Sequence, residues 1–99
     1  MVSRAIDVFL ANDVNAYAAT CGMLGSFDVG DRLHSVSVPT AILVGDEDYA
    51  APPPMALLLH EHIAGSAHAV VPGARHLLPL EMPSLVARTL RELLARAGA

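Results

Sequence analysis

The stretch Ala41-Ile42-Leu43-Val44-Gly45-Asp46-Glu47-Asp48-Tyr49-Ala50-Ala51-Pro52 decides the fold of this 99-residue chain. It begins as a continuous apolar run, stops at a glycine and gives way to an acidic loop. Continuous rather than alternating apolar residues are typical of a strand covered on both faces, as in a parallel sheet. Pro53 and Pro54 follow, and proline suits the first turn of a helix. The stretch therefore predicts a buried parallel strand over residues 40–45 with a carboxylate beyond its C-terminal end.

Outward from this stretch, toward the C-terminus, helix and strand patterns alternate. They predict a helix over residues 53–64 that ends at Gly65, a second strand over 67–71, a loop over 74–82, and a last helix that starts at Pro83 or Ser84. The residues expected to face the core are Met55, Leu58, Leu59, His62 and Ile63 in the first of these helices, and Val86, Leu90, Leu93, Leu94 and Ala97 in the last. A strand, a crossover helix and a second strand make a parallel pair, so the fold class is α/β.

Toward the N-terminus, apolar residues recur at three- and four-residue steps over residues 3–24 and predict helices. Asn12-Asp13 separates two sets of these residues and can cap the second helix, which Gly22 and Gly25 are expected to end. Asp28 can cap a short turn of helix after that. The chain order is therefore helices over residues 1–35, then strand, helix, strand and helix over residues 36–99.

The composition narrows the classes of protein and of partner. Apolar residues make up 54% of the chain and charged residues 16%, where about 25% charged is usual. Either part of the apolar surface expects a partner, or the chain is simply rich in alanine. A net charge of −4 argues against nucleic acid. Cys21 stands alone, which excludes an internal disulfide. The sequence has neither a signal peptide nor an apolar run of the ~18 residues that a membrane span needs, so the expected location is cytoplasmic.

Two titratable side chains follow the ends of the two predicted strands. Asp48 comes after the first strand and His76 after the second, in Pro72-Gly73-Ala74-Arg75-His76-Leu77. Neighbouring parallel strands lie ~4.8 Å apart and end at the same edge of a sheet, where ligand sites form. A carboxylate on one imidazole nitrogen leaves the other free to take a proton from a nucleophile. We therefore expect Asp48 and His76 to meet at this edge.

These residues resemble a known family. Gly45-Asp46-Glu47-Asp48-Tyr49-Ala50-Ala51-Pro52 is similar to the acid loop of the α/β-hydrolases, Gly-x-x-Asp-x-x-x-Pro, and Gly73-Ala74-Arg75-His76 followed by Glu81-x-Pro83 is similar to their histidine loop. The acid precedes the histidine, as in the family. The resemblance covers nearly all of residues 12–97 and is greatest to 3-oxoadipate enol-lactonase and its relatives. It implies the C-terminal part of such a hydrolase, with residues 1–35 from the end of the cap and residues 36–99 from the core.

The resemblance also implies roles for particular residues. Asp48 would be the acid and His76 the base of a Ser-Asp-His triad, in a parent enzyme that hydrolyses a small carboxylic ester or an enol-lactone. No metal or organic cofactor is implied. Arg75 departs from the family, where a small residue is common, and either lowers the pKa of His76 or points to solvent. Asp46 is the fallback for the acid.

Other titratable residues have structural interpretations. Glu81, just before the last helix, suits the helix macrodipole better than catalysis. His60 and His62 stand two apart and do not share a helix face, so we expect surface and core-edge positions for them rather than a metal pair.

The nucleophile of the family is absent from this sequence. Its Gly-x-Ser-x-Gly motif does not occur, and Gly22-Met23-Leu24-Gly25-Ser26 does not fit it. An acid and a histidine without a nucleophile cannot form an acyl intermediate, so we expect the chain alone to have little or no esterase activity. One interpretation is therefore the C-terminal piece of an enzyme whose N-terminal part is missing. The alternative is a non-catalytic chain that associates with itself or with an N-terminal partner.

Overall fold

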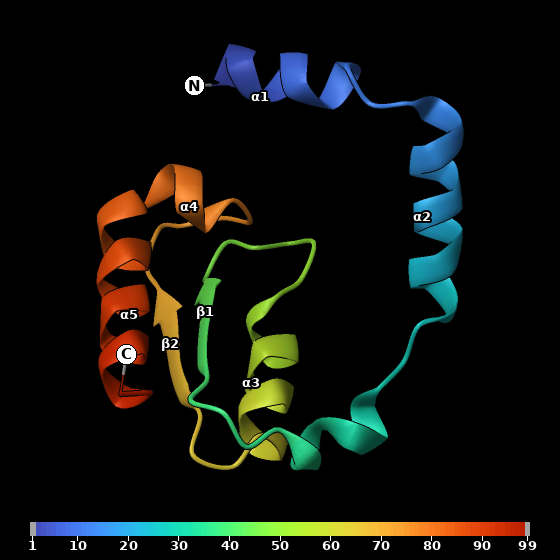
Figure 1. The fold of residues 1–99 in the computed structure, drawn as a ribbon. Helices are drawn as coiled ribbons and strands as arrows, with labels where there is room; N and C mark the ends of the chain where they lie inside the picture. The colour runs from blue at the N-terminus through green and yellow to red at the C-terminus, as the bar shows by residue number, and fades with distance from the viewer. Residues whose placement is uncertain (1, 99) are drawn as a thin grey trace. The chain divides into compact units, whose positions relative to one another are not determined.

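A computed structural model describes residues 2–98 (Figure 1). The chain divides into two compact units, with the boundary between Gly30 and Asp31. The outermost residues of the two predicted segments, Met1 and Ala99, lie outside the described part. The elements are α1 (Val2–Leu10), α2 (Val14–Ser26), the 3-10 helix η1 (Gly30–Ser35), β1 (Ala41–Gly45), α3 (Pro53–His62), β2 (Ala67–Val71), α4 (Leu78–Glu81) and α5 (Pro83–Arg96). Among the described residues, no helix combines the length and apolar character needed to cross a bilayer.

The first unit consists of α1 and α2, and neither helix has a buried residue. Asp13 caps α2 as predicted, because its side chain accepts a hydrogen bond of 2.8 Å from the Ala16 amide. The helix ends at Ser26, one residue after Gly25, so its predicted end is correct to within one residue, whereas Gly22 does not end it. A helical glycine costs about 1 kcal/mol relative to alanine, which weakens a helix without stopping it. Whether this segment belongs to a cap remains a prediction.

The second unit is built on a two-stranded parallel sheet, as predicted. Ala41 of β1 pairs with Ala67 of β2, and the register continues to Gly45 opposite Val71. Pro53 opens α3, which ends at His62, two residues earlier than predicted. The turn back to β2 passes through Gly65 at φ 73°, a left-handed conformation that glycine adopts freely. Before β1, the Asp28 carboxylate accepts from the Gly30 amide at 2.8 Å and caps η1.

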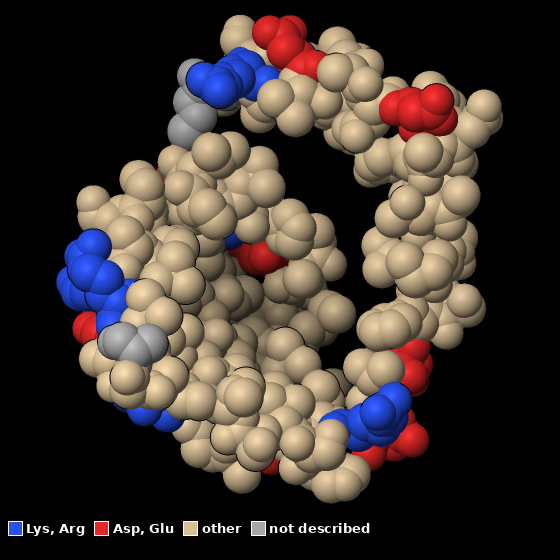
Figure 2. Space-filling model, in the orientation of Figure 1, with Lys and Arg blue, Asp and Glu red and all other residues tan. Residues whose placement is uncertain are grey.

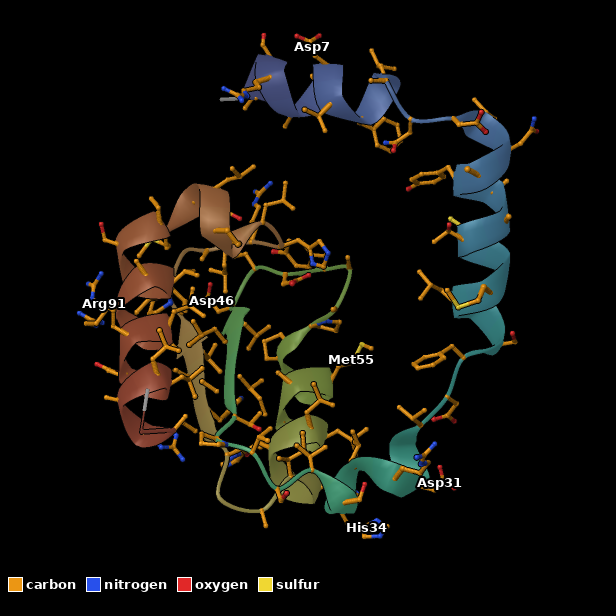
Figure 3. The ribbon with its side chains drawn as sticks, in the orientation of Figure 1. Asp7, Asp31, His34, Asp46, Met55 and Arg91 are labelled. Atoms are coloured by element: carbon orange, nitrogen blue, oxygen red, sulfur yellow. The ribbon has the colours of Figure 1, made fainter. Side chains whose placement is uncertain are left out.

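The predicted core face of α3 is wrong in most of its residues. Ala56 and Ile63 are buried, whereas Met55, Leu58 and Leu59 are exposed. Figure 3 shows Met55 projecting from α3 on the side away from the strands. Small Ala56 lets the helix approach the sheet closely, and the longer side chains then lie on the outer face. Residues 55–59 are all apolar, so their spacing alone does not identify the face that packs on the sheet.

His60 completes the inner face of α3. Its ring stacks on that of His68 in β2, with ring centroids 5.1 Å apart and planes 17° apart. His60 Nδ1 also lies 2.8 Å from the Ser66 hydroxyl, while Nε2 of His68 is buried without a hydrogen-bond partner among the described residues. His60 is therefore half-buried between α3 and β2.

The small core of this unit lies where β2 leads into the last helices. Val71, Ala74 and Leu78 are buried together, and Leu43, Leu85 and Val86 pack against them. The predicted loop over residues 74–82 contains the short helix α4 instead, and buried Leu78 begins it. Leu90 and Leu94, expected in the core face of α5, are more than half exposed. The α5 residues Arg88, Arg91 and Arg96 are exposed.

Gly45 is required by a close approach of two backbone segments. A Cβ atom on this residue would overlap the carbonyl group of Ala74 and lie 2.7 Å from the carbonyl oxygen of Arg75. Both of these groups are backbone, so they cannot rotate away as a side chain could. The absence of a side chain at Gly45 therefore lets the loop after β2 cross the end of β1.

We expect Gly45→Ala to lower the free energy of unfolding by about 1–3 kcal/mol or more, the usual cost of overpacking. Urea denaturation, monitored by circular dichroism, measures this free energy. Gly22→Ala is the matched control, because no atom lies within 4 Å of a Cβ there, and it should leave stability unchanged or raise it. Equal effects of the two substitutions would contradict the assigned contact.

Candidate functional site

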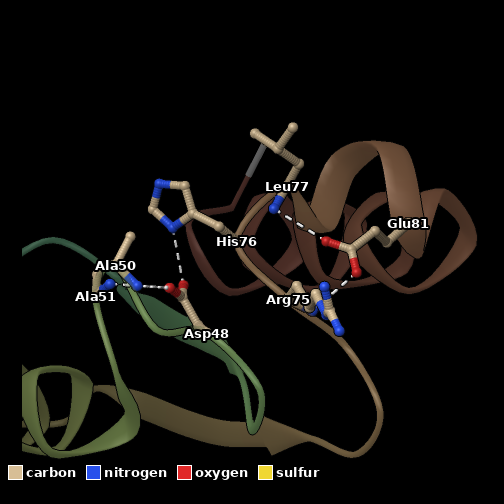
Figure 4. A network of polar contacts seen from close by, with 7 residues as sticks. All are labelled: Asp48, Ala50, Ala51, Arg75, His76, Leu77 and Glu81. Carbon is tan, nitrogen blue, oxygen red and sulfur yellow. Dashed lines mark hydrogen bonds and ion pairs between the residues drawn. The ribbon is translucent and has the colours of Figure 1, made fainter. Parts of the chain in front are cut away.

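Asp48 and His76 meet at the edge of the sheet where β1 and β2 end. Nδ1 of His76 lies 2.9 Å from Oδ2 of Asp48, and Figure 4 shows this contact from close by. The Asp48 side chain is 7% exposed and the His76 side chain 58%. Because an ionised carboxylate is an acceptor, Nδ1 donates the proton of this hydrogen bond. In the neutral form of the ring, Nε2 then carries the lone pair, and no residue among 2–98 makes a hydrogen bond to it.

The backbone of its own loop fixes the Asp48 carboxylate. Oδ1 accepts hydrogen bonds from the amides of Ala50 at 3.0 Å and Ala51 at 2.8 Å, which leaves Oδ2 for His76. The bond from Ala51 and the bond from His76 lower the pKa of Asp48 below its ordinary value of 3.8, although burial opposes them. The carboxylate is therefore ionised at neutral pH and has a fixed orientation.

Asp46, the fallback for the acid, contacts the histidine loop at a different point. Its amide donates to the carbonyl oxygen of Val71 at 3.0 Å, and its carboxylate accepts from the Gly73 amide at 2.8 Å. The Glu47 amide donates to the Ala74 carbonyl oxygen at 3.0 Å. These bonds join the acid loop to the start of the histidine loop. The acid that binds the His76 ring is Asp48.

Glu81 has a role that the sequence pattern did not reveal. Its Oε1 accepts from the Arg75 amide at 2.8 Å and its Oε2 from the Leu77 amide at 3.0 Å (Figure 4). These two residues flank His76. Arg75 itself is exposed, in agreement with the interpretation that it points to solvent. The one signal in the sequence was the position of Glu81, five residues after His76 and two before Pro83.

An apolar hollow of about 320 Å³ adjoins His76. It lies between β1 and α5, and Leu43, Leu78, Val86 and Leu90 contribute to its wall. A larger hollow of about 540 Å³ continues along the sheet and is lined by both apolar and charged residues, among them Arg88 and Glu92. The imidazole of His76 therefore stands beside space large enough for another side chain or a small molecule.

Among residues 2–98, no hydroxyl or thiol side chain makes a hydrogen bond to His76 or Asp48, and no metal site forms beside them. The hydroxyls of Ser26 and Ser35 bond to nearby carbonyl oxygens, and that of Ser66 bonds to His60. Within residues 2–98, no group of three histidine, cysteine or acidic side chains is arranged to hold a metal ion. His60 and His62 bind different partners, since Nδ1 of His62 lies 2.8 Å from the carbonyl oxygen of Leu58.

Comparison with known proteins finds similarity among solved structures. No family model matches the chain, and no curated protein matches it. The enol-lactonase from Burkholderia xenovorans LB400 is similar with a TM-score of 0.84 and 27% identity, over 90% of this chain and 34% of that one. A thermophilic esterase from Thermogutta terrifontis, with malate bound, gives a TM-score of 0.66 and 36% identity, over 73% of this chain and 26% of that one.

A serine hydrolase involved in carbazole degradation, the CarC enzyme, is also similar. Its TM-score is 0.72 and its identity 26%, over 82% of this chain and 33% of that one. The chain therefore spans about a third of the enol-lactonase and of this serine hydrolase, and about a quarter of the esterase.

The lowered pKa of Asp48 predicts how stability depends on pH. Because the folded-state pKa lies below 3.8, the ionised carboxylate stabilises the fold above that pH, and its contribution is lost as the pH falls through the folded-state pKa. Asp48→Asn should therefore weaken the acid dependence of the free energy of unfolding. Urea denaturation from about pH 6 to about pH 2.5 covers this range. Asp7→Asn, at an exposed position of α1, should change the acid dependence little, and equal slopes for both variants would contradict the assignment.

Proposed function

Because this chain has the fold of the C-terminal part of an α/β-hydrolase, we propose that Asp48 and His76 are the acid and the base of a Ser-Asp-His triad. The observation that carries the proposal is the 2.9 Å contact between Asp48 Oδ2 and His76 Nδ1 at the shared edge of two parallel strands. The family order of acid before histidine supports it.

The chemistry follows from the tautomer that Asp48 imposes. Nε2 of His76 would take the proton of a serine hydroxyl while the serine oxygen attacks the carbonyl carbon of an ester or lactone. The same nitrogen would then give this proton to the departing oxygen, leaving an acyl-serine. A water that loses its proton to Nε2 would attack the acyl group, and the serine would regain its proton as the acid leaves. Asp48 would stabilise the imidazolium at each of these stages.

The proposed substrate class is a small carboxylic ester or an enol-lactone. The support is the similarity to an enol-lactonase and to an esterase, together with the apolar hollow beside His76. Since the chain spans about a third of that enol-lactonase, most of a substrate pocket would come from other polypeptide. The serine and the oxyanion hole would come from there too, because the sequence has no Gly-x-Ser-x-Gly motif.

Reconstitution tests this proposal. Co-expression with an N-terminal hydrolase segment that carries Gly-x-Ser-x-Gly should give esterase activity toward p-nitrophenyl acetate and an enol-lactone. His76→Ala should lower kcat by at least about 10³-fold and Asp48→Asn by about 10²–10⁴-fold, because the general base is lost or misdirected.

His34→Ala is the control, because His34 is exposed, and this variant should retain full activity. A reconstituted complex whose activity survives His76→Ala would refute the proposal. So would turnover by the chain alone that depends on His76, because the chain would then need no further nucleophile.

A second candidate function is association with another polypeptide, and the open sheet favours it. In residues 2–98 the sheet has two strands, so each has an unpaired edge, and such edges pair readily with other chains. Thr40 and Asp46 bond to β2, so the alternating backbone groups of Ala41 and Leu43 point away from it. Figure 2 shows a face of this unit on which uncharged side chains cover most of the surface.

If the edge of β1 mediates association, the purified chain should elute as a discrete dimer in size-exclusion chromatography with light scattering. Ala41→Lys, at that edge, should give monomers because charged side chains block edge pairing. Ala67→Lys, at the paired position in β2, should leave the dimer intact. A monomer that unfolds cooperatively would rule this candidate out.

A further inference from the structure

His76 has little side-chain packing to hold it in place. Its side chain is 58% exposed, and Arg75 and Leu77 on either side are exposed as well. The hydrogen bond to Asp48 orients the ring but needs a backbone that presents the ring at the right place. The geometry of the Asp48–His76 pair therefore depends on what fixes the backbone of residues 75–77.

Contacts on both sides hold the neighbouring parts of the histidine loop. Before His76, Asp46 binds the Gly73 amide and the Glu47 amide binds the Ala74 carbonyl oxygen. After it, Leu78 is buried at the start of α4. The contacts therefore reach Ala74 on one side and Leu78 on the other, and the exposed residues 75–77 lie between them.

Glu81 spans the gap between these contacts. One carboxylate oxygen accepts from the Arg75 amide at 2.8 Å and the other from the Leu77 amide at 3.0 Å. The two amides belong to the peptide units on either side of the one that joins Arg75 to His76. The Glu81 amide in turn donates to the Leu77 carbonyl oxygen at 3.0 Å, which ties the carboxylate to the same segment. Figure 4 shows the carboxylate lying against this segment, on the side of the loop away from the imidazole.

We propose that Glu81 is a positioning residue that sets the backbone of His76 so that Nδ1 reaches Asp48. The significance of this role for catalysis rests on the proposed function, whereas the geometric role does not. Each of the two carboxylate oxygens of Glu81 accepts from one of the two amides that flank His76. Glutamine offers one acceptor oxygen and an amino group, so it would keep one bond and set a donor against the other amide.

The tautomer of His76 tests this proposal without any assay of activity. Long-range ¹H–¹⁵N correlation spectra of the imidazole, assigned with His76→Asn, distinguish Nδ1–H from Nε2–H in the neutral ring. The wild-type chain should show Nδ1–H as the dominant neutral form. Glu81→Ala should reduce it to a minority, and Glu81→Gln should give an intermediate population because one bond remains.

Asp46→Ala is the matched control. It also removes a carboxylate bond to the backbone of the histidine loop, three residues before His76, so it should lower the denaturation midpoint while keeping the wild-type tautomer. Folded Glu81 variants with the wild-type tautomer would overturn the proposal, as would an equal loss in Asp46→Ala. A wild-type chain dominated by Nε2–H would overturn it as well. If neither Glu81 variant folds while Asp46→Ala does, Glu81 stabilises the fold rather than positions His76.

The same variants separate this proposal from the proposed function. In the reconstituted enzyme, Glu81→Gln should lower kcat and leave KM unchanged, because the base is misplaced while the pocket is intact. A complex that is inactive even with wild-type Glu81, in chains whose tautomers change as expected, would refute the triad and leave the positioning role standing.

Discussion

The parallel pairing of β1 with β2 is the constraint on which the rest of the second unit depends. Because the strands run in the same direction and in register from Ala41 opposite Ala67, their following loops leave from one edge. The hydrogen bond from the Asp46 amide to Val71 continues the ladder by one residue. Gly45, which has no side chain, then lets the second loop cross the end of the first strand. The carboxylate of Asp48 and the imidazole of His76 come together as a consequence.

Carboxylates organise the backbone around this edge. Loops carry amides that no neighbouring strand or helix satisfies, and an ionised carboxylate accepts such hydrogen bonds strongly. Asp46 binds one amide of the histidine loop, Asp48 binds two amides of its own loop, and Glu81 binds the two amides that flank His76. Asp48 differs from the other two because its second oxygen remains for the imidazole.

Side-chain burial is limited, which bears on the two functional interpretations. The core of the second unit consists of a few residues around Val71, Ala74 and Leu78, and several leucines of α3 and α5 are exposed. A small domain gains little from burial relative to the entropy that folding costs. Exposed apolar side chains and open strand edges would gain stability from additional polypeptide. Both the enzyme-piece proposal and the association proposal would supply such polypeptide.

Local patterns in the sequence were sufficient to predict the strand, helix and strand of the second unit and the capping aspartates Asp13 and Asp28. They also predicted that Asp48 meets His76. Each depends on neighbours in the chain or on the shared edge of parallel strands. Tertiary structure decided the buried face of α3, where Ala56 rather than Met55 approaches the sheet, and the helical turn that begins at buried Leu78. It also gave Glu81 its partners, because the position of Glu81 five residues after His76 does not reveal which backbone amides the carboxylate binds. Such contacts exist when the folded chain brings the acceptor and the amides together.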